Sequence, residues 1–101
     1  MNKEIISGTF YGIKKTYRSK NGRYLFTFEF INKGSYIDIS CSNPPSLNGR
    51  SSAVEKTHIW PSNKICFVNG KEPKNMSRAQ NLASQWAEYY LNYIKTGETA
   101  S

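Results

Sequence analysis

An alternation of aromatic residues over 24–30 constrains the fold of this chain more than any other feature. Every second residue there is aromatic, which places four rings on one face of an extended strand: Tyr24, Phe26, Phe28 and Phe30. Asn21-Gly22 lies just before them, and Asn-Gly is the strongest short signal for a tight hairpin because both turn positions need a positive φ. We therefore predict two antiparallel strands, at 8–18 and 23–31, with one face that has to be covered.

The chain that follows predicts a third strand and a helix that covers the sheet. Asn32-Lys33-Gly34 marks a second turn, and 35–41 is predicted to be the third strand. Residues 78–96 carry an apolar stripe at helical spacing: Ala79, Leu82, Ala83, Trp86, Tyr90, Tyr93 and Ile94. Ser77-Arg78-Ala79-Gln80 matches a capping box at the start of this helix, and Gly97 follows its end. We expect an α+β fold, an antiparallel β-meander packed against a C-terminal helix.

Length and hydropathy limit the organisation of the chain. At 101 residues we expect a single domain over 1–101 with an ordered core at about 8–97. Residues 42–57 are rich in turn formers, so we predict a long surface loop that closes with a short strand at Ala53-Val54. No apolar run approaches the roughly 20 residues of a membrane span, and the first residues lack the apolar stretch of a signal peptide. A cytoplasmic protein with no membrane partner is expected.

Two cysteines and one histidine limit the chemistry of any site. Without a secretory signal, Cys41 and Cys66 are expected to be free thiols. These residues fall short of a four-ligand zinc site and no CxxC pair is present, so we predict no metal and no cofactor. Cys41 ends the third strand on its apolar side and is expected to be buried and structural.

Cys66 lies in a different context. A Trp-Pro-Ser-Asn turn at 60–63 comes before it, His58 lies eight residues ahead of it, and Ile65 and Phe67 flank it. Such a segment can hold a thiol at a surface cleft, where it acts as a nucleophile or as a thioester carrier. Trp60 is expected to pack beside this segment or, where exposed, to bind a partner.

The formal net charge of +7 is unevenly distributed. Five cations crowd a ten-residue stretch at the first predicted hairpin: Lys14, Lys15, Arg18, Lys20 and Arg23. A solvated hairpin tip, a docking surface for an acidic protein partner and a nucleic-acid surface all fit this pattern.

Two motifs together resemble a known family. The first is His-x7-Cys with an apolar residue on each side of Cys66, and the second is an aromatic helix, with Trp86, Tyr89, Tyr90 and Tyr93, that closes with Thr96-Gly97. In this order, after three strands and a Pro-rich loop, they resemble the prokaryotic ubiquitin-conjugating-enzyme-like proteins over about residues 8–97.

The resemblance implies a ubiquitin-conjugating fold and a transferase activity. Cys66 would accept the C-terminus of a ubiquitin-like protein from its activating enzyme as a thioester and pass it to an amine. His58 would fix the loop beside the cysteine, or orient groups there. Such systems often lie in bacterial antiviral defence operons, where the modified target can be a cyclic-nucleotide synthase.

The chain departs from the family at three places, of which one is the loop at Pro44-Pro45, a shortened version of the family's Tyr-Pro-x-x-Pro stretch. Eukaryotic members carry His-Pro-Asn ahead of the cysteine, but Ile59-Trp60 follow His58 here, so that asparagine is missing. Asn63 is a nearby amide able to stabilise an oxyanion, although a role in the turn alone also explains it. The family's N-terminal helix is expected to be absent because the first strand begins almost at once. These losses suggest a minimal conjugating enzyme or an inactive relative.

Two other functions stay open. A non-catalytic adaptor with the same fold would keep Cys66 as a packing residue. A small basic nucleic-acid-binding domain would use the aromatic sheet face together with the hairpin at 14–23. The helix has to cover that face, however, which would bury the rings, so nucleic acid is the least favoured partner.

Overall fold

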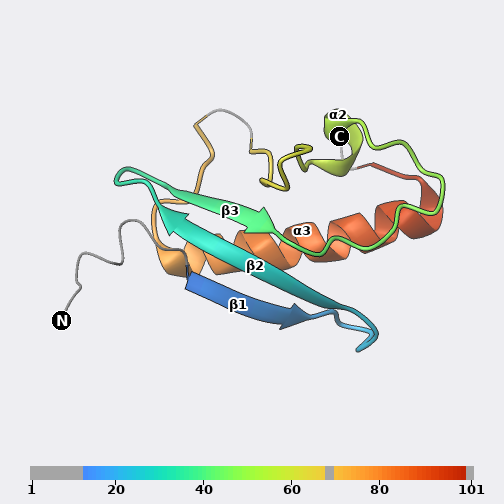
Figure 1. Ribbon diagram of the computed structural model, residues 1–101, viewed down its shortest axis with the longest axis horizontal. Helices are drawn as coiled ribbons and strands as arrows, with labels where there is room; N and C mark the ends of the chain where they lie inside the picture. Colours follow the sequence, from blue (N-terminus) through green and yellow to red (C-terminus); the bar gives the residue numbers. More distant parts are fainter. Residues whose placement is uncertain (1–12, 68–69, 100–101) are drawn as a thin grey trace.

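The computed structural model describes residues 13–67 and 70–99. Three antiparallel strands form a sheet in the order β1-β2-β3, with β1 at Ile13–Arg18, β2 at Leu25–Asn32 and β3 at Ile37–Cys41. A short helix, α2 (Val54–Thr57), and a long one, α3 (Met76–Thr96), follow (Figure 1). The predicted meander, the C-terminal helix and the α+β class are therefore confirmed. The first strand's predicted part at 8–12, and the expected lack of an N-terminal helix, lie outside the described residues.

Alternate side chains of the central strand, β2, point to a buried face of the sheet. Phe26, Phe28 and Phe30 are 0%, 1% and 3% exposed. The same face continues on β3, because Phe28 lies opposite Cys41, which is also buried. Tyr24 lies before the strand begins and is 41% exposed. The predicted aromatic face is confirmed for the three phenylalanines and wrong for Tyr24.

The turn that joins β1 to β2 is wider than the Asn-Gly signal predicts. It spans residues 19–24, where the Ser19 N–H donates to the Tyr24 carbonyl at 2.9 Å and the Gly22 N–H donates to the Ser19 carbonyl at 2.8 Å. Gly22 has a φ of +77°. Asn21 instead contributes its side chain, whose Oδ1 accepts from Ser19 Oγ at 2.6 Å and from the Arg23 N–H at 2.9 Å. This side-chain acceptor favours the six-residue loop over a two-residue turn.

The long helix α3 begins before the predicted position. Its N-cap is Asn75, whose Oδ1 accepts from the Arg78 N–H at 2.8 Å. The predicted capping box at Ser77 is therefore wrong, because the helix is capped two residues earlier by the side chain of Asn75. The predicted end is confirmed: the helix stops at Thr96, and Gly97 adopts the left-handed conformation with a φ of 77°.

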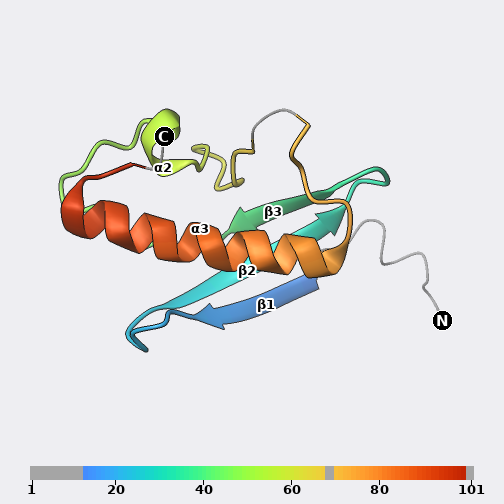
Figure 2. The ribbon, with the colours of Figure 1, turned by 180° about the vertical axis from the view of Figure 1, so that it is seen from behind.

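The helix lies across the buried face of the sheet, as Figure 2 shows from the side that carries α3. Trp86 is the main contact, since its ring meets Phe26 and Phe28 edge-on with centroids 5.9 and 6.0 Å apart. Such aromatic pairs contribute about 0.5–1.5 kcal/mol each beyond the area that they bury. The expectation that the helix buries the phenylalanine rings is confirmed.

Residues 42–53 form the predicted long loop, which is anchored to the far end of α3. Arg50 donates to the carbonyls of Ile94 and Lys95 at 3.2 Å each, and the Tyr93 hydroxyl donates to the Ser51 carbonyl at 2.8 Å. The short strand predicted at Ala53-Val54 is wrong. The chain forms α2 there, because N–H groups at 56–58 donate back to the carbonyls of residues 53 and 54. None of the helices in the described part of the chain combines the length and apolar character of a membrane span.

Candidate functional site

A small hairpin at 59–65 positions the cysteine. Ile59 and Ile65 form an antiparallel bridge, Trp60 N–H donates to the Lys64 carbonyl at 2.9 Å, and Asn63 N–H donates to the Trp60 carbonyl at 2.8 Å. Pro61 presets the second position of this turn, and Asn63, with a φ of 71°, takes the left-handed position that asparagine tolerates. The predicted Trp-Pro-Ser-Asn turn is confirmed.

This hairpin extends the sheet beyond β3. Cys41 N–H donates to the Asn63 carbonyl at 2.9 Å, and Ile65 N–H donates to the Ile39 carbonyl at 2.8 Å. Ile59 and Ile65 are 9% and 3% exposed, so the apolar side of the hairpin belongs to the core. Cys66 therefore follows directly from a segment fixed by both backbone pairing and burial.

The hairpin brings His58 and Cys66 together, although seven residues separate them in sequence. Cys66 N–H donates to the His58 carbonyl at 2.8 Å, so the two are neighbours across the hairpin. Both residues are partly buried, and Cys66 is a free thiol. This contact joins the two backbones, and it places a partly accessible thiol on the segment next to His58.

Helix α3 holds His58 from the other side. His58 is the C-cap of α2 and has a left-handed φ of 57°. Its ring lies against the ring of Tyr89, with centroids 5.1 Å apart, and the Tyr89 hydroxyl donates to the Lys56 carbonyl. Three residues earlier, Trp86 Nε1 donates to the Thr57 carbonyl at 2.9 Å. These two contacts fix the end of α2 and hence the position of His58.

Sequence reasoning missed the role of Tyr89 at this site. Tyr89 lies off the main apolar stripe of α3, and its spacing of three from Trp86 places both side chains toward α2. That spacing was the available signal. The spacing identifies Tyr89 as a packing partner of α2 only when the position of α2 is known. The apolar stripe does not give that position.

Two other candidate residues have different surroundings. Trp60, at the turn of the hairpin, is 45% exposed, so it is not the packed residue that was expected, and contact with a partner stays a prediction. Asn63 contributes its backbone N–H and carbonyl to the turn and to β3. Its left-handed conformation is sufficient to explain an asparagine at this position.

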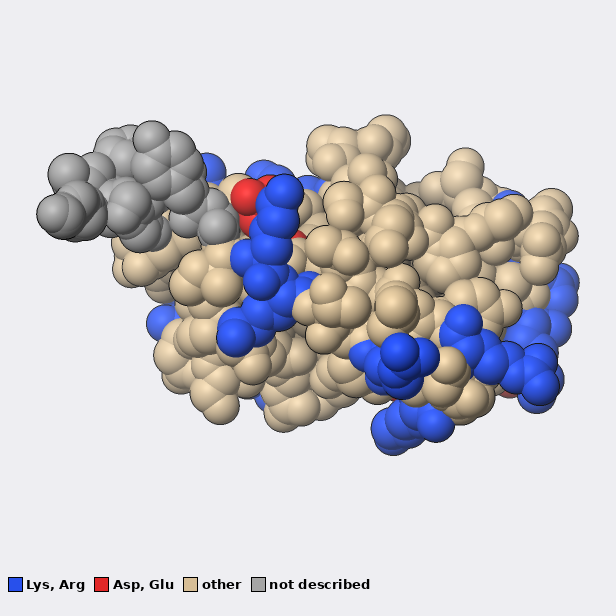
Figure 3. Space-filling view, turned by 60° about the horizontal axis from the view of Figure 1, so that its bottom comes forward, with Lys and Arg blue, Asp and Glu red and all other residues tan. Residues whose placement is uncertain are grey.

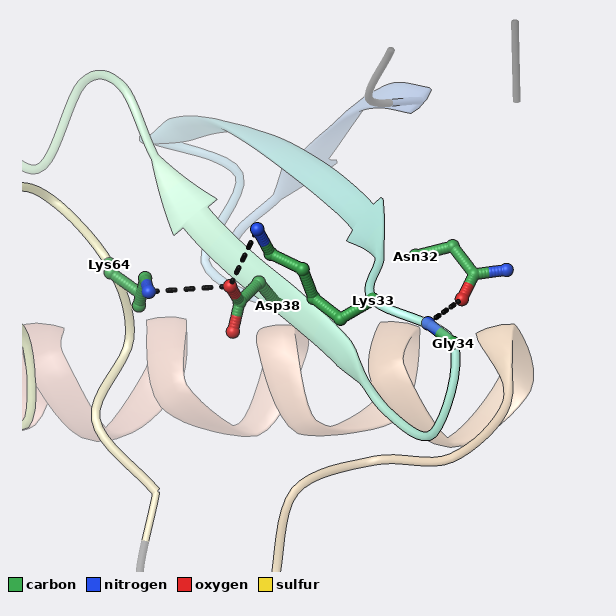
Figure 4. Close-up of polar contacts among 5 residues, drawn as sticks. All are labelled: Asn32, Lys33, Gly34, Asp38 and Lys64. Atoms are coloured by element: carbon green, nitrogen blue, oxygen red, sulfur yellow. Dashed lines mark hydrogen bonds and ion pairs between the residues drawn. The ribbon is translucent and has the colours of Figure 1, made fainter. Parts of the chain in front are cut away.

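An ion pair fixes the outer side of the same hairpin. Lys64 Nζ lies 3.3 Å from Asp38 Oδ2, and Lys33 Nζ lies 4.0 Å from the same oxygen. Figure 4 shows the two lysines approaching Asp38 of β3 from the hairpin and from the β2–β3 turn. In that turn, Asn32 Oδ1 accepts from the Gly34 N–H at 2.8 Å. Lys64 thus tethers the hairpin to β3.

The second cysteine is buried, as predicted. Cys41 is 0% exposed, and its Sγ lies 3.7 Å from Asn43 Oδ1. Burial raises the pKa of the Cys41 thiol, and a hydrogen bond from the backbone of Asn43 lowers it by less. A buried thiol held in its protonated form is a poor nucleophile, and Cys66, which is partly exposed, is the more accessible of the two cysteines.

The five predicted basic residues do not form one surface. Lys14 lies opposite Glu29 and Lys15 opposite Phe28, so these neighbours point to different faces of β1. Lys20 and Arg23 lie in the loop at 19–24, and Arg18 donates to the Gly22 carbonyl at 3.0 Å. Figure 3 shows Lys and Arg side chains in separate groups on this side of the molecule. The strand order places them at the β1 edge, whereas the cysteine hairpin lies at the β3 edge.

Comparison with known protein families, curated proteins and solved structures found no match for this chain. Within residues 13–67 and 70–99, no group of three or more His, Cys, Asp or Glu residues lies together in a way that would hold a metal ion. Any inference about function therefore rests on the geometry of the chain itself.

Proposed function

We propose that this chain is a minimal ubiquitin-conjugating-enzyme-like protein, which carries a ubiquitin-like protein as a thioester on Cys66. The observation that supports it best is the pairing of Cys66 with His58 across the 59–65 hairpin. Of the two cysteines, Cys66 is the one with solvent access. The α+β arrangement of a meander covered by a C-terminal helix is compatible with this proposal.

The proposed reaction has two balanced steps. In the first, the Cys66 thiolate attacks the thioester carbonyl that joins the ubiquitin-like protein to its activating enzyme. A new carbon–sulfur bond forms at Cys66, the old one breaks, and the enzyme's sulfur leaves as a thiolate. In the second, a target amine attacks the same carbonyl, an amide bond forms, and Cys66 leaves and takes up the amine's proton.

The neighbouring residues have supporting roles in this proposal. His58 is a positioning residue that fixes the backbone beside Cys66. Exposed Trp60 is a contact for the ubiquitin-like protein or its activating enzyme, because large exposed aromatic residues are frequent binding hot spots. Neither Asn63 nor any other amide is assigned to the oxyanion, so we expect slow transfer to amines compared with enzymes that have such a donor.

A synthetic peptide thioester tests the first step without a partner protein. We expect the acyl group to move to Cys66, as measured by intact mass and by peptide mapping. Cys66→Ala should abolish this transfer, whereas Cys41→Ser should retain it, which makes the buried cysteine the matched control. Acylation of Cys41 alone, or of neither cysteine, would contradict the proposal and favour the adaptor.

The second assay uses an activating enzyme, ATP and a ubiquitin-like protein from one bacterial conjugation system. A band that disappears on reduction, and is lost in Cys66→Ala, is the expected result on a non-reducing gel. Acylation by the peptide thioester with no such band would limit the proposal to the reactivity of Cys66 and exclude that pair as its partners. A defence-system target such as a cyclic-nucleotide synthase would be the next substrate to test.

A further inference from the structure

A basic cleft lies at the end of the molecule opposite the start of α3. The loop at 19–24 forms one wall, the C-terminal half of α3 forms the other, and Asn48 of the long loop closes one side. Its volume is about 860 Å³. Glu88, Asn92 and Lys95 recur at a spacing of three and four residues, so one face of α3 lines this cleft. We call it the tip cleft.

The charge of the tip cleft is positive. Lys20 and Arg23 come from the loop and Lys95 from the helix, and all three side chains are exposed. Glu88 is the acidic residue of the lining, and its Oε2 accepts from the Tyr17 hydroxyl at 2.5 Å and from the Lys20 N–H at 2.9 Å. These two neutral donors join β1 and the loop to α3 through Glu88, and the three cations of the lining outnumber this one carboxylate. Figure 3 shows Lys and Arg gathered at this end, at right, with few acidic side chains.

An exposed aromatic ring lies among these cations. Tyr24 lines the tip cleft and is 41% exposed, unlike the phenylalanine rings of β2. The lining also contains the amide side chains of Asn21, Asn48 and Asn92, all of which are exposed. The cations can bind phosphates, and the accessible ring gives a surface on which a base can stack. The amides can form hydrogen bonds with base edges.

We propose that the tip cleft binds a single-stranded nucleic acid, a function separate from the chemistry at Cys66. Single strands are bound in positively charged grooves that follow the phosphate backbone and present aromatic side chains on which bases stack. A duplex fits less well, because its bases are already stacked and cannot reach Tyr24. An acidic peptide would match the cations but would make no specific use of the ring or the amides. Burial of the sheet face excludes base stacking on Phe26, Phe28 and Phe30, which the sequence suggested, but it does not affect Tyr24.

Fluorescence anisotropy with a labelled oligothymidylate of about 12 nucleotides, within the site sizes of known single-strand binders, tests this proposal. We expect binding that weakens between about 50 and 200 mM salt, with a log–log slope near −0.7 for each phosphate contacted. Arg23→Gln and Lys95→Gln should each lower the affinity several-fold and make the slope shallower. Lys74→Gln is the matched control, because Lys74 is exposed and lies before α3, remote from the tip cleft.

Substitutions of Tyr24 distinguish a nucleic-acid site from a site that binds any anion through its cations. Tyr24→Leu should weaken binding by roughly five- to one-hundred-fold, whereas Tyr24→Phe, which keeps a stacking surface, should retain most of it. Equal loss in both variants, no loss in either, or no salt-sensitive binding at all would overturn the proposal. Polyglutamate or a duplex that competes as well as the unlabelled oligonucleotide would overturn it too, in favour of an acidic peptide or a duplex. The Cys66→Ala variant should bind like the original chain.

Discussion

The hydroxyl of Tyr17 donates a 2.5 Å hydrogen bond to Oε2 of Glu88, which joins the edge strand β1 to the middle of α3. The same oxygen accepts from the Lys20 N–H at 2.9 Å, so one carboxylate holds both the strand and the loop that follows it. This contact raises the pKa of Tyr17 to about 12, mainly through the hydrogen bond to Glu88, then through burial and the carboxylate's charge.

The raised pKa predicts a loss of stability in strong alkali. The folded protein favours neutral Tyr17, so the contribution is fully present below the ordinary tyrosine pKa of about 10 and is lost as the pH rises through about 12. We expect the unfolding midpoint in urea to fall less steeply between these pH values in Tyr17→Phe than in the original chain. Because Tyr17 is about half ionised near pH 12, tyrosinate absorbance at that pH should decrease by roughly half a residue in the folded variant. A parallel decline in both proteins would contradict the coupling.

Gly97 and Arg50 give a second prediction. Gly97 has a φ of +77°, and a Cβ there would lie 2.7 Å from an Arg50 guanidinium nitrogen. Gly97→Ala therefore adds backbone strain of about 1–2 kcal/mol and displaces Arg50 from the carbonyls of Ile94 and Lys95, each bond contributing about 1 kcal/mol. Urea denaturation should show a larger loss of unfolding free energy than in Gly22→Ala.

Gly22 is a matched control for this substitution. It has the same φ of +77°, and an added Cβ meets nothing within 4 Å. The difference between the two alanine variants should therefore report the two Arg50 hydrogen bonds, at about 2 kcal/mol together. In an Arg50→Ala background this difference should nearly vanish. If it persists there, the displacement of Arg50 is not its cause.

The start of α3 supplies a third prediction, which compares the observed cap with the one that the sequence suggests. Asn75→Ala removes the side chain that accepts from the Arg78 N–H and should lower the free energy of unfolding by about 1 kcal/mol. Ser77→Ala should change it by less than about 0.5 kcal/mol, because Ser77 is an exposed residue of the first turn. Chemical denaturation of both variants decides between the two caps, and a larger effect at Ser77 would refute this assignment.

The elements that patterns predicted well are those that depend on burial along many residues. The alternation of Phe26, Phe28 and Phe30 and the stripe on α3 each repeat the same requirement, so a local exception does not change the result. Turns and caps depend on single hydrogen bonds, and several nearby side chains are able to form each of these bonds. Asn21 contributes its side chain to the turn rather than a positive φ. Asn75 caps the helix, although Ser77 matches the capping-box pattern.

The candidate site was predictable only in part, for a related reason. The turn at 60–63 has its own sequence signal in Pro61 and Asn63, and it is sufficient to bring His58 beside Cys66. The contact of His58 with Tyr89 depends on where α3 passes α2, which no local pattern encodes. The tip cleft likewise combines the loop at 19–24 with Lys95, far apart in sequence, and so could not be assembled from the cluster of cations at 14–23.

The contact between His58 and Tyr89 gives the last prediction, which concerns the position of His58. His58 is the one histidine of the chain, so its ring-proton signals can be assigned in a proton NMR spectrum without ambiguity. An aromatic ring with its centroid 5.1 Å away shifts those signals. Tyr89→Leu should therefore move them toward the values of a free histidine, whereas Tyr89→Phe, which keeps the ring and loses the hydroxyl bond to the Lys56 carbonyl, should move them less.

A kinetic measurement on the same variants tests whether this position matters to Cys66. If His58 positions the backbone beside the thiol, acylation of Cys66 by the peptide thioester should slow severalfold in Tyr89→Leu and change little in Tyr89→Phe. Circular dichroism serves as the control for folding, because Tyr89 is only partly buried and both variants are expected to keep the helix. Signals that move in Tyr89→Leu without any change in rate would separate the packing of His58 from the reactivity of Cys66, and would remove His58 from the proposed site.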